Sequence, residues 1–148
     1  MRFVLVDRII SLAPGESIVA SRLIRPDEEY FRDHFPGFPV VPGVLLTEMM
    51  AQTAGKCLDA QRLPRGKAML ARILSASFRQ WVRPGDDVLL HAAIQTNDER
   101  YATAECHCRV GEATVAQAKL FFSFLPITDF APDIRDEVLE TYLAGQQA

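Results

Sequence analysis

The sequence has few cysteines and histidines and only one tryptophan. Its 148 residues include three cysteines and three histidines. An odd number of cysteines cannot pair completely within one chain, and no CxxC pair of the kind that binds zinc is present. The pattern excludes a disulfide scaffold and gives no indication of a metal centre. We expect Cys57, Cys106 and Cys108 to be reduced and structural.

The sequence also lacks a long apolar run. No stretch approaches the ~20 residues needed to cross a membrane. The first apolar segment is interrupted by Asp7 and Arg8, which is too early for a secretory signal. We therefore expect a cytoplasmic protein with no membrane-spanning segment.

The sequence also has no large excess of positive or negative charge. The formal net charge is -3, with 49% hydrophobic and 24% charged residues. This composition is typical of one ordinary globular domain and excludes a disordered chain. It gives no indication of nucleic-acid binding.

Period-two patterns predict most of the chain to be β-sheet. Residues 3–11 and 17–24 are predicted to form an opening hairpin with its turn at Pro14-Gly15. From 68 to 124 the chain returns repeatedly to strand-like runs. The clearest predicted strand spans residues 101–110, where polar and apolar residues alternate. Gly111-Glu112, which follows it, is predicted to be a hairpin loop.

One long helix is predicted between these β regions, from about Pro42 or Gly43 to Cys57. It is apolar nearly all round, so other elements should enclose it. The pattern predicts an α+β hotdog fold, in which a long antiparallel β-sheet wraps around one central apolar helix. Residues 1–125 would form this domain, and 126–148 an acidic C-terminal extension with a short surface helix.

The predicted helix carries one carboxylate, Glu48, among apolar side chains. Burial raises the pKa of a carboxyl group, so Glu48 could donate a proton near neutral pH. Alternatively, Glu48 points to a helix end or subunit surface and meets water. His34 precedes a proline-rich turn that leads back to the helix start at Gly43, where free backbone N-H groups attract negative charge.

Together these groups suit the dehydration of a 3-hydroxyacyl thioester. Neutral His34 would remove the α-proton, and the N-H groups at Gly43 would hold the enolate-like oxygen. Protonated Glu48 would assist departure of the hydroxyl group.

The stretch HFPGFPVVPGVLLTEMMAQ, residues 34–52, closely resembles the signature of the 3-hydroxyacyl-[acyl-carrier-protein] dehydratases of FabZ type. The resemblance covers about residues 3–125. It implies a hotdog fold, no metal or organic cofactor, and homodimers that often assemble into hexamers. In these dimers one subunit supplies the histidine and its partner the glutamate.

The resemblance also assigns roles within the motif. It implies that His34 and Glu48 are catalytic, that Gly43 is an oxyanion donor and that Gln52 supports the site. The remaining positions implied to bind substrate are Phe35, Pro36, Phe38, Pro42 and Val44.

Three departures from the family pattern are Met49, the run 71–74 and Trp81. They lie where the acyl tunnel would be shaped. The sequence therefore leaves acyl-chain length and pathway open, whether fatty-acid, polyketide-like or aryl-polyene-like.

A basic stretch indicates the partner. Between residues 60 and 85 there are no acidic residues, and the bases are Arg62, Arg65, Lys67, Arg72, Arg79 and Arg83. Such a surface would attract an acidic acyl carrier protein bearing a 3-hydroxyacyl-phosphopantetheine. Alternatively, these side chains are scattered and solvated.

Two other functions stay open at the level of sequence. A hotdog thioesterase would use a helix carboxylate to activate water, although hydrolysis does not require a histidine on the Pro-Gly turn. A non-catalytic acyl-binding protein would need neither His34 nor Glu48.

Overall fold

The structure, a computed structural model, describes residues 1–62, 65–126, 129 and 134–146. The described part contains one antiparallel sheet, a long helix α1 (Gly43–Arg62), a 3-10 helix η1 (Glu29–Arg32) and a helix α2 (Glu137–Gln146). The strands are β1 (Arg8–Ala13), β2 (Ser17–Leu23), β3 (Gly66–Phe78), β4 (Asp87–Asn97), β5 (Tyr101–Val110) and β6 (Ala113–Pro126).

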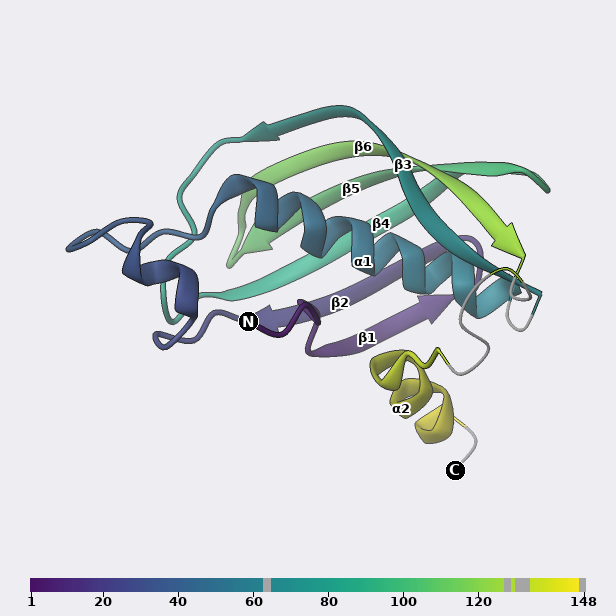
Figure 1. The fold of residues 1–148 in the computed structure, drawn as a ribbon, viewed down its shortest axis with the longest axis horizontal. Helices are drawn as coiled ribbons and strands as arrows, with labels where there is room; N and C mark the ends of the chain where they lie inside the picture. The colour runs from purple at the N-terminus through teal and green to yellow at the C-terminus, as the bar shows by residue number, and fades with distance from the viewer. Residues whose placement is uncertain (63–64, 127–128, 130–133, 147–148) are drawn as a thin grey trace.

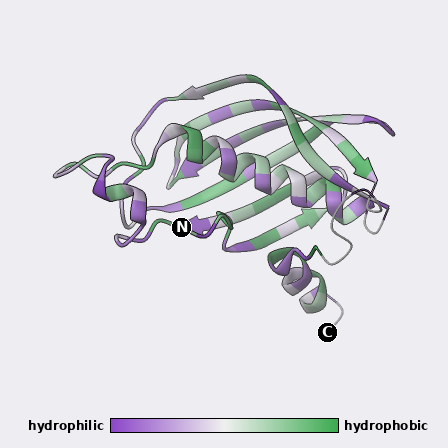
Figure 2. Cartoon of the chain, viewed as in Figure 1, coloured by the Kyte–Doolittle hydropathy of each residue, from purple (hydrophilic) through white to green (hydrophobic). Residues whose placement is uncertain are grey.

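The six strands form one sheet in the order β1-β2-β4-β5-β6-β3. The sheet curves around α1, with β1 and β3 at its two edges (Figure 1). Hydrophobic residues recur along the strands that pass behind α1 (Figure 2). This is the α+β architecture predicted from the sequence, with the helix packed against the inner face of the sheet.

Helix α1 is buried along most of its length, as its apolar composition predicts. It ends at Arg62 rather than at Cys57. The predicted end was wrong because two polar residues beyond Gly55, Lys56 and Asp59, are themselves buried. Lys56 and Asp59 are 7% and 1% exposed, and each has an ion-pair partner.

The opening hairpin forms, but its first strand begins at Arg8 and not at residue 3. Residues 3–7 carry an apolar run typical of a strand, yet they pack beside α1. The backbone of Phe3 and Leu5 is bound by the side chain of Gln52 instead of by a neighbouring strand.

The hairpin between β5 and β6 is as predicted. Ala102, Ala104, Cys106 and Cys108 face the core, and the polar residues between them face outward. Gly111 has a φ of 60°, a conformation that glycine adopts at no steric cost.

The predicted C-terminal helix is α2. Leu139, 1% exposed, belongs to the main core, and α2 contacts β1. Asp136 caps the helix by accepting a hydrogen bond from the Leu139 N-H group. Asp133, one of the acids of the tail, lies outside the described residues. Neither α1 nor any other helix of the described part combines the length and hydropathy of a membrane span.

Candidate active site

His34 lies in the loop between η1 and α1 and is half-buried. Its Nδ1 atom is 2.9 Å from the carbonyl oxygen of Val40. A carbonyl only accepts hydrogen bonds, so in neutral His34 the proton is on Nδ1 and Nε2 is left with a free lone pair. The ring stacks on Phe35 with centroids 4.1 Å apart. These contacts leave Nε2 as the proton acceptor.

Backbone hydrogen bonds fix the His34 loop from both sides. The His34 carbonyl accepts from Val40 N-H at 3.1 Å, and the Val41 N-H group donates to Val82 at 2.8 Å. Within the loop, Phe35 and Phe38 exchange two backbone hydrogen bonds. The proline-rich segment therefore returns to the start of α1, as its sequence predicts.

Gly43 is the first residue of α1. A Cβ atom at this position would lie 3.2 Å from the Phe78 ring, so glycine permits the close approach of β3 to the helix start. The first N-H groups of a helix have no intrahelical partner and point outward from its end. This end of α1 can bind a negatively polarised oxygen.

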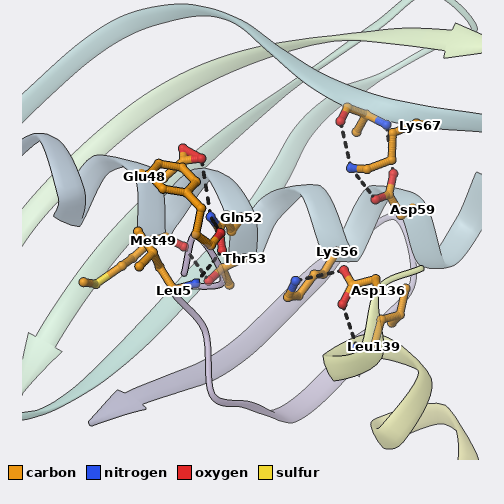
Figure 3. Close-up of polar contacts among 12 residues, drawn as sticks. Leu5, Glu48, Met49, Gln52, Thr53, Lys56, Asp59, Lys67, Asp136 and Leu139 are labelled. Atoms are coloured by element: carbon orange, nitrogen blue, oxygen red, sulfur yellow. Dashed lines mark hydrogen bonds and ion pairs between the residues drawn. The ribbon is translucent and has the colours of Figure 1, made fainter. Parts of the chain in front are cut away.

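Glu48 is half-buried on the side of α1 shown in Figure 3. Burial raises its pKa above the ordinary value of 4.5, and a hydrogen bond from Gln52 lowers it to a smaller extent. The donor is Gln52 Nε2, 3.5 Å from Glu48 Oε1. The carboxyl group is thus disposed to hold a proton at higher pH than an exposed glutamate would.

His34 and Glu48 are not joined within one chain. Glu48 lines a cavity of about 1090 Å³ that runs beside α1, and His34 is not among the residues that line it. No hydrogen bond connects the two side chains in the described part of the protein. Gly43 and His34 stand at the start of α1, whereas Glu48 faces the cavity further along.

The remaining predicted substrate-binding residues surround the start of α1. Phe35, Phe38 and Val44 are 51%, 38% and 75% exposed. Pro36 is also exposed, and Pro42 is half-buried. Large apolar side chains gathered in this way form an exposed apolar surface at the start of α1.

Phe38 is part of an exposed aromatic and basic group that the motif did not predict. Its ring meets Trp81 edge to face at 5.1 Å, and the Arg83 guanidinium lies 4.7 Å above it. Trp81, noted as a departure from the family pattern, therefore contacts the loop that carries His34.

Only part of the basic stretch is free to meet a partner. Arg62 donates hydrogen bonds to Asn97 at the end of β4 and to the Glu99 carbonyl in the turn before β5, and it lies over Phe124. Lys67 is paired with Asp59 at 2.7 Å. The exposed remainder consists of Arg65, Arg72, Arg79 and Arg83.

A buried ionic cluster around Arg22 was not predicted. Its guanidinium binds Asp7 at 3.0 Å and also Glu28, which directly precedes η1. Arg22 thus joins β2 to the start of the segment that leads to His34. A single basic residue on the inner face of an apolar strand was the signal in the sequence, because such a charge needs buried partners.

Comparison with known proteins identifies the family. Residues 1–119 match the FabA-like domain family. The 3-hydroxyacyl-[acyl-carrier-protein] dehydratase FabZ of Lactobacillus helveticus is 39% identical over 79% of this chain and 80% of its own length. The chain belongs to the FabZ-type dehydratases. The FabZ protein of Pediococcus pentosaceus is 41% identical over 79% of each chain, and that of Listeria monocytogenes 37% over 82% and 85%.

Solved structures agree on the fold of this FabZ-type protein. The dehydratase heterocomplex ApeI:P from Xenorhabdus doucetiae gives a TM-score of 0.68 at 16% identity over 85% of this chain and 86% of its own. The fluoroacetyl-CoA thioesterase FlK gives 0.67 at 13% identity over 81% and 93%. The predictions of a hotdog fold, a FabZ-type family and dehydratase activity are confirmed.

Proposed function

We propose that this enzyme converts 3-hydroxyacyl chains on an acyl carrier protein to trans-2-enoyl chains, with His34 as base and Glu48 as acid. The proposal rests on the contrasting environments of the two side chains. Nδ1 of His34 is hydrogen-bonded to the Val40 carbonyl, and the Glu48 carboxyl group is partly desolvated. One group is ready to accept a proton and the other to donate one.

The proton balance follows from these roles. Nε2 of His34 takes the proton from C2 of the substrate, and the N-H groups at the start of α1 hold the enolate-like oxygen of the thioester. The bond between C3 and oxygen then breaks, and the hydroxyl group leaves as water with the proton from Glu48. Transfer of the proton from His34 back to Glu48 completes the cycle.

We propose that a homodimer assembles the complete site. Strand β3 is at the edge of the sheet and is exposed from Leu70 onward, including Ile73 at 53% and Leu74 at 46%. A long apolar edge strand leaves unpaired backbone groups that favour pairing with another strand. The same edge of a second copy is a self-complementary partner.

We propose that this pairing is centred on Leu74, which would give a shared site. Leu74 is midway in the exposed stretch from Leu70 to Phe78. Antiparallel pairing centred there sets Phe78 opposite the partner's Leu70. Phe78 adjoins Gly43, and Leu70 lines the same cavity as Glu48. The His34 end of one copy then meets the Glu48 cavity of the other.

We also propose that the partner is an acidic carrier protein, that the enzyme acts in the cytoplasm, and that the chain is divided into a catalytic domain and a C-terminal extension. Exposed Arg83, which lies over Phe38 of the His34 loop, and exposed Arg79 favour an acidic carrier protein. Three free, buried cysteines are consistent with action in the cytoplasm. The family match ends at residue 119, which supports a catalytic domain of 1–125 followed by an extension of 126–148.

The test is turnover of carrier-linked 3-hydroxyacyl substrates, followed both as enoyl thioester and as free thiol. We expect enoyl product without thiol, and a loss of several orders of magnitude in kcat for Glu48→Gln and for His34→Ala. Release of free thiol would identify a thioesterase. Unchanged acyl binding with no product from the wild type would identify a binding protein.

A further inference from the structure

Asp136 of the C-terminal extension forms an ion pair with Lys56 in the second half of α1. Asp136 Oδ2 is 2.8 Å from Lys56 Nζ, and the two side chains are 20% and 8% exposed. The other oxygen of Asp136 accepts the N-H group of Leu139 at 3.0 Å. Figure 3 shows this contact further along α1 than Glu48. Asp136 is thereby held from two sides and cannot turn away without losing both contacts.

The ion pair and Glu48 share one cavity. The space of about 1090 Å³ beside α1 is lined by Glu48 and Gln52 as well as by Lys56, Ile134 and Asp136, and beyond Lys56 by a second ion pair, Asp59–Lys67. A helix rises 1.5 Å per residue, so Lys56 lies about 12 Å beyond Glu48 along the helix axis. The extension therefore lines the same space into which the proposed acid projects.

The lining that α1 and the sheet supply between these two points includes small and apolar residues, whereas lining residues from the N-terminal part of the chain, such as Arg2, Asp7 and Arg25, are charged. On α1 the small and apolar residues are Ala51 and Gly55, and from the sheet they are Leu70 and Phe122. A Cβ atom added at Gly55 would meet no heavy atom within 4 Å. The cavity is thus open beside Gly55, and its lining there suits a hydrocarbon chain.

We propose that the Lys56–Asp136 ion pair ends the acyl passage and sets the longest 3-hydroxyacyl chain that this enzyme accepts. The inference rests on the proposed dehydration, because it takes the reacting carbons to lie at Glu48. Burial of a hydrocarbon tail beside Ala51 and Gly55 is favourable because it removes apolar surface from water. Further extension would have to separate a buried ion pair, which leaves uncompensated charges.

Two variants of the full chain move chain-length selectivity in opposite directions. Gly55→Leu fills the open space, so the ratio of kcat/KM for long over short acyl chains should fall by about tenfold or more. Replacing the pair with Lys56→Met and Asp136→Leu removes the charged end, so the same ratio should rise by a similar factor. The matched control removes an exposed ion pair that does not line the cavity, Lys119→Gln with Glu105→Gln on the sheet, and should keep the wild-type ratio.

The measurement is kcat/KM on carrier-linked 3-hydroxyacyl chains of graded length, with circular dichroism to confirm the fold of each variant. A ratio unchanged in Gly55→Leu would overturn the inference, as would a uniform loss at every chain length. If the double variant does not fold, the single variant Lys56→Met tests the charged end, because Asp136 is partly exposed and keeps its hydrogen bond from Leu139; an unchanged ratio there would overturn the inference. Wild-type protein that makes no enoyl product at any length would instead refute the proposed function.

Discussion

The side-chain amide of Gln52 joins the N-terminal segment to the carboxyl group of Glu48. Gln52 Oε1 accepts the Leu5 N-H group at 2.9 Å, and Nε2 donates to the Phe3 carbonyl at 2.9 Å and to Glu48 at 3.5 Å. One glutamine thereby replaces the strand pairing that residues 3–5 lack and orients the proposed acid.

Removing this amide should shift the pH dependence of activity. The Gln52 hydrogen bond lowers the pKa of Glu48, whereas burial raises it. In Gln52→Ala only the raising effect is left, so Glu48 should keep its proton to higher pH. The alkaline limb of the kcat/KM profile should move to higher pH, while Gln117→Ala, on the outer face of the sheet, should leave it in place. A limb that moves to lower pH would contradict Glu48 as the acid.

Glu48 should also make folding stability depend on pH. Its folded-state pKa is raised above 4.5, so the folded protein binds this proton more tightly than the unfolded chain does. Its contribution to stability is greatest below the unfolded pKa and declines as pH rises through the folded pKa. The Glu48→Gln variant has no carboxyl group to titrate and so lacks this decline. The difference between its Tm and the wild-type Tm should therefore shift in favour of the variant as the pH is raised from 4. Parallel Tm curves would show that Glu48 is not desolvated.

Charge on the exposed edge of β3 should prevent assembly. Ile73→Glu places a carboxylate on the stretch proposed to pair with a second copy. Analytical ultracentrifugation should detect monomers, and turnover should be lost although His34 and Glu48 are both intact. Leu143→Glu, an equally drastic change on α2, should leave the assembly unchanged. An active Ile73→Glu monomer would refute the shared site.

The Arg22 cluster should hold the His34 loop in place. Arg22→Met leaves Asp7 and Glu28 without their buried cation, which should cost about 3 kcal/mol of unfolding free energy. Arg25→Met is the matched control, because Arg25 meets the same Asp7 at 3.5 Å but is 47% exposed. Its cost should be about 0–1 kcal/mol. Urea unfolding measures both, and equal losses would show that the cluster does not anchor the loop.

Local patterns in the sequence predicted the elements whose contacts are local. The turn at Gly111-Glu112 and the alternation in 101–110 are encoded by neighbouring residues, and the structure agrees with both. The proline-rich run after His34 likewise predicted a loop that returns to Gly43. His34 and Glu48 were predicted as catalytic residues because each residue type is unusual in its setting, and their roles stay a prediction.

The features that were missed depend on contacts between distant parts of the chain. The N-terminal run looked like a strand because its partner, Gln52, is 47 residues away from Leu5. The end of α1 was placed too early because Lys56 is neutralised by Asp136, which is 80 residues further along. The edge position of β3 follows from the order of the sheet, which no short pattern encodes.

In the proposed dimer, His34 of one subunit works with Glu48 of the other. The most direct test of this shared site is co-expression of His34→Ala and Glu48→Gln chains with different tags, followed by purification of the mixed dimer. One of its two sites then keeps both groups, so the mixed dimer should recover about half of wild-type turnover while each parent homodimer is inactive. A mixed dimer as inactive as its parents would place both groups in a single chain and contradict the account.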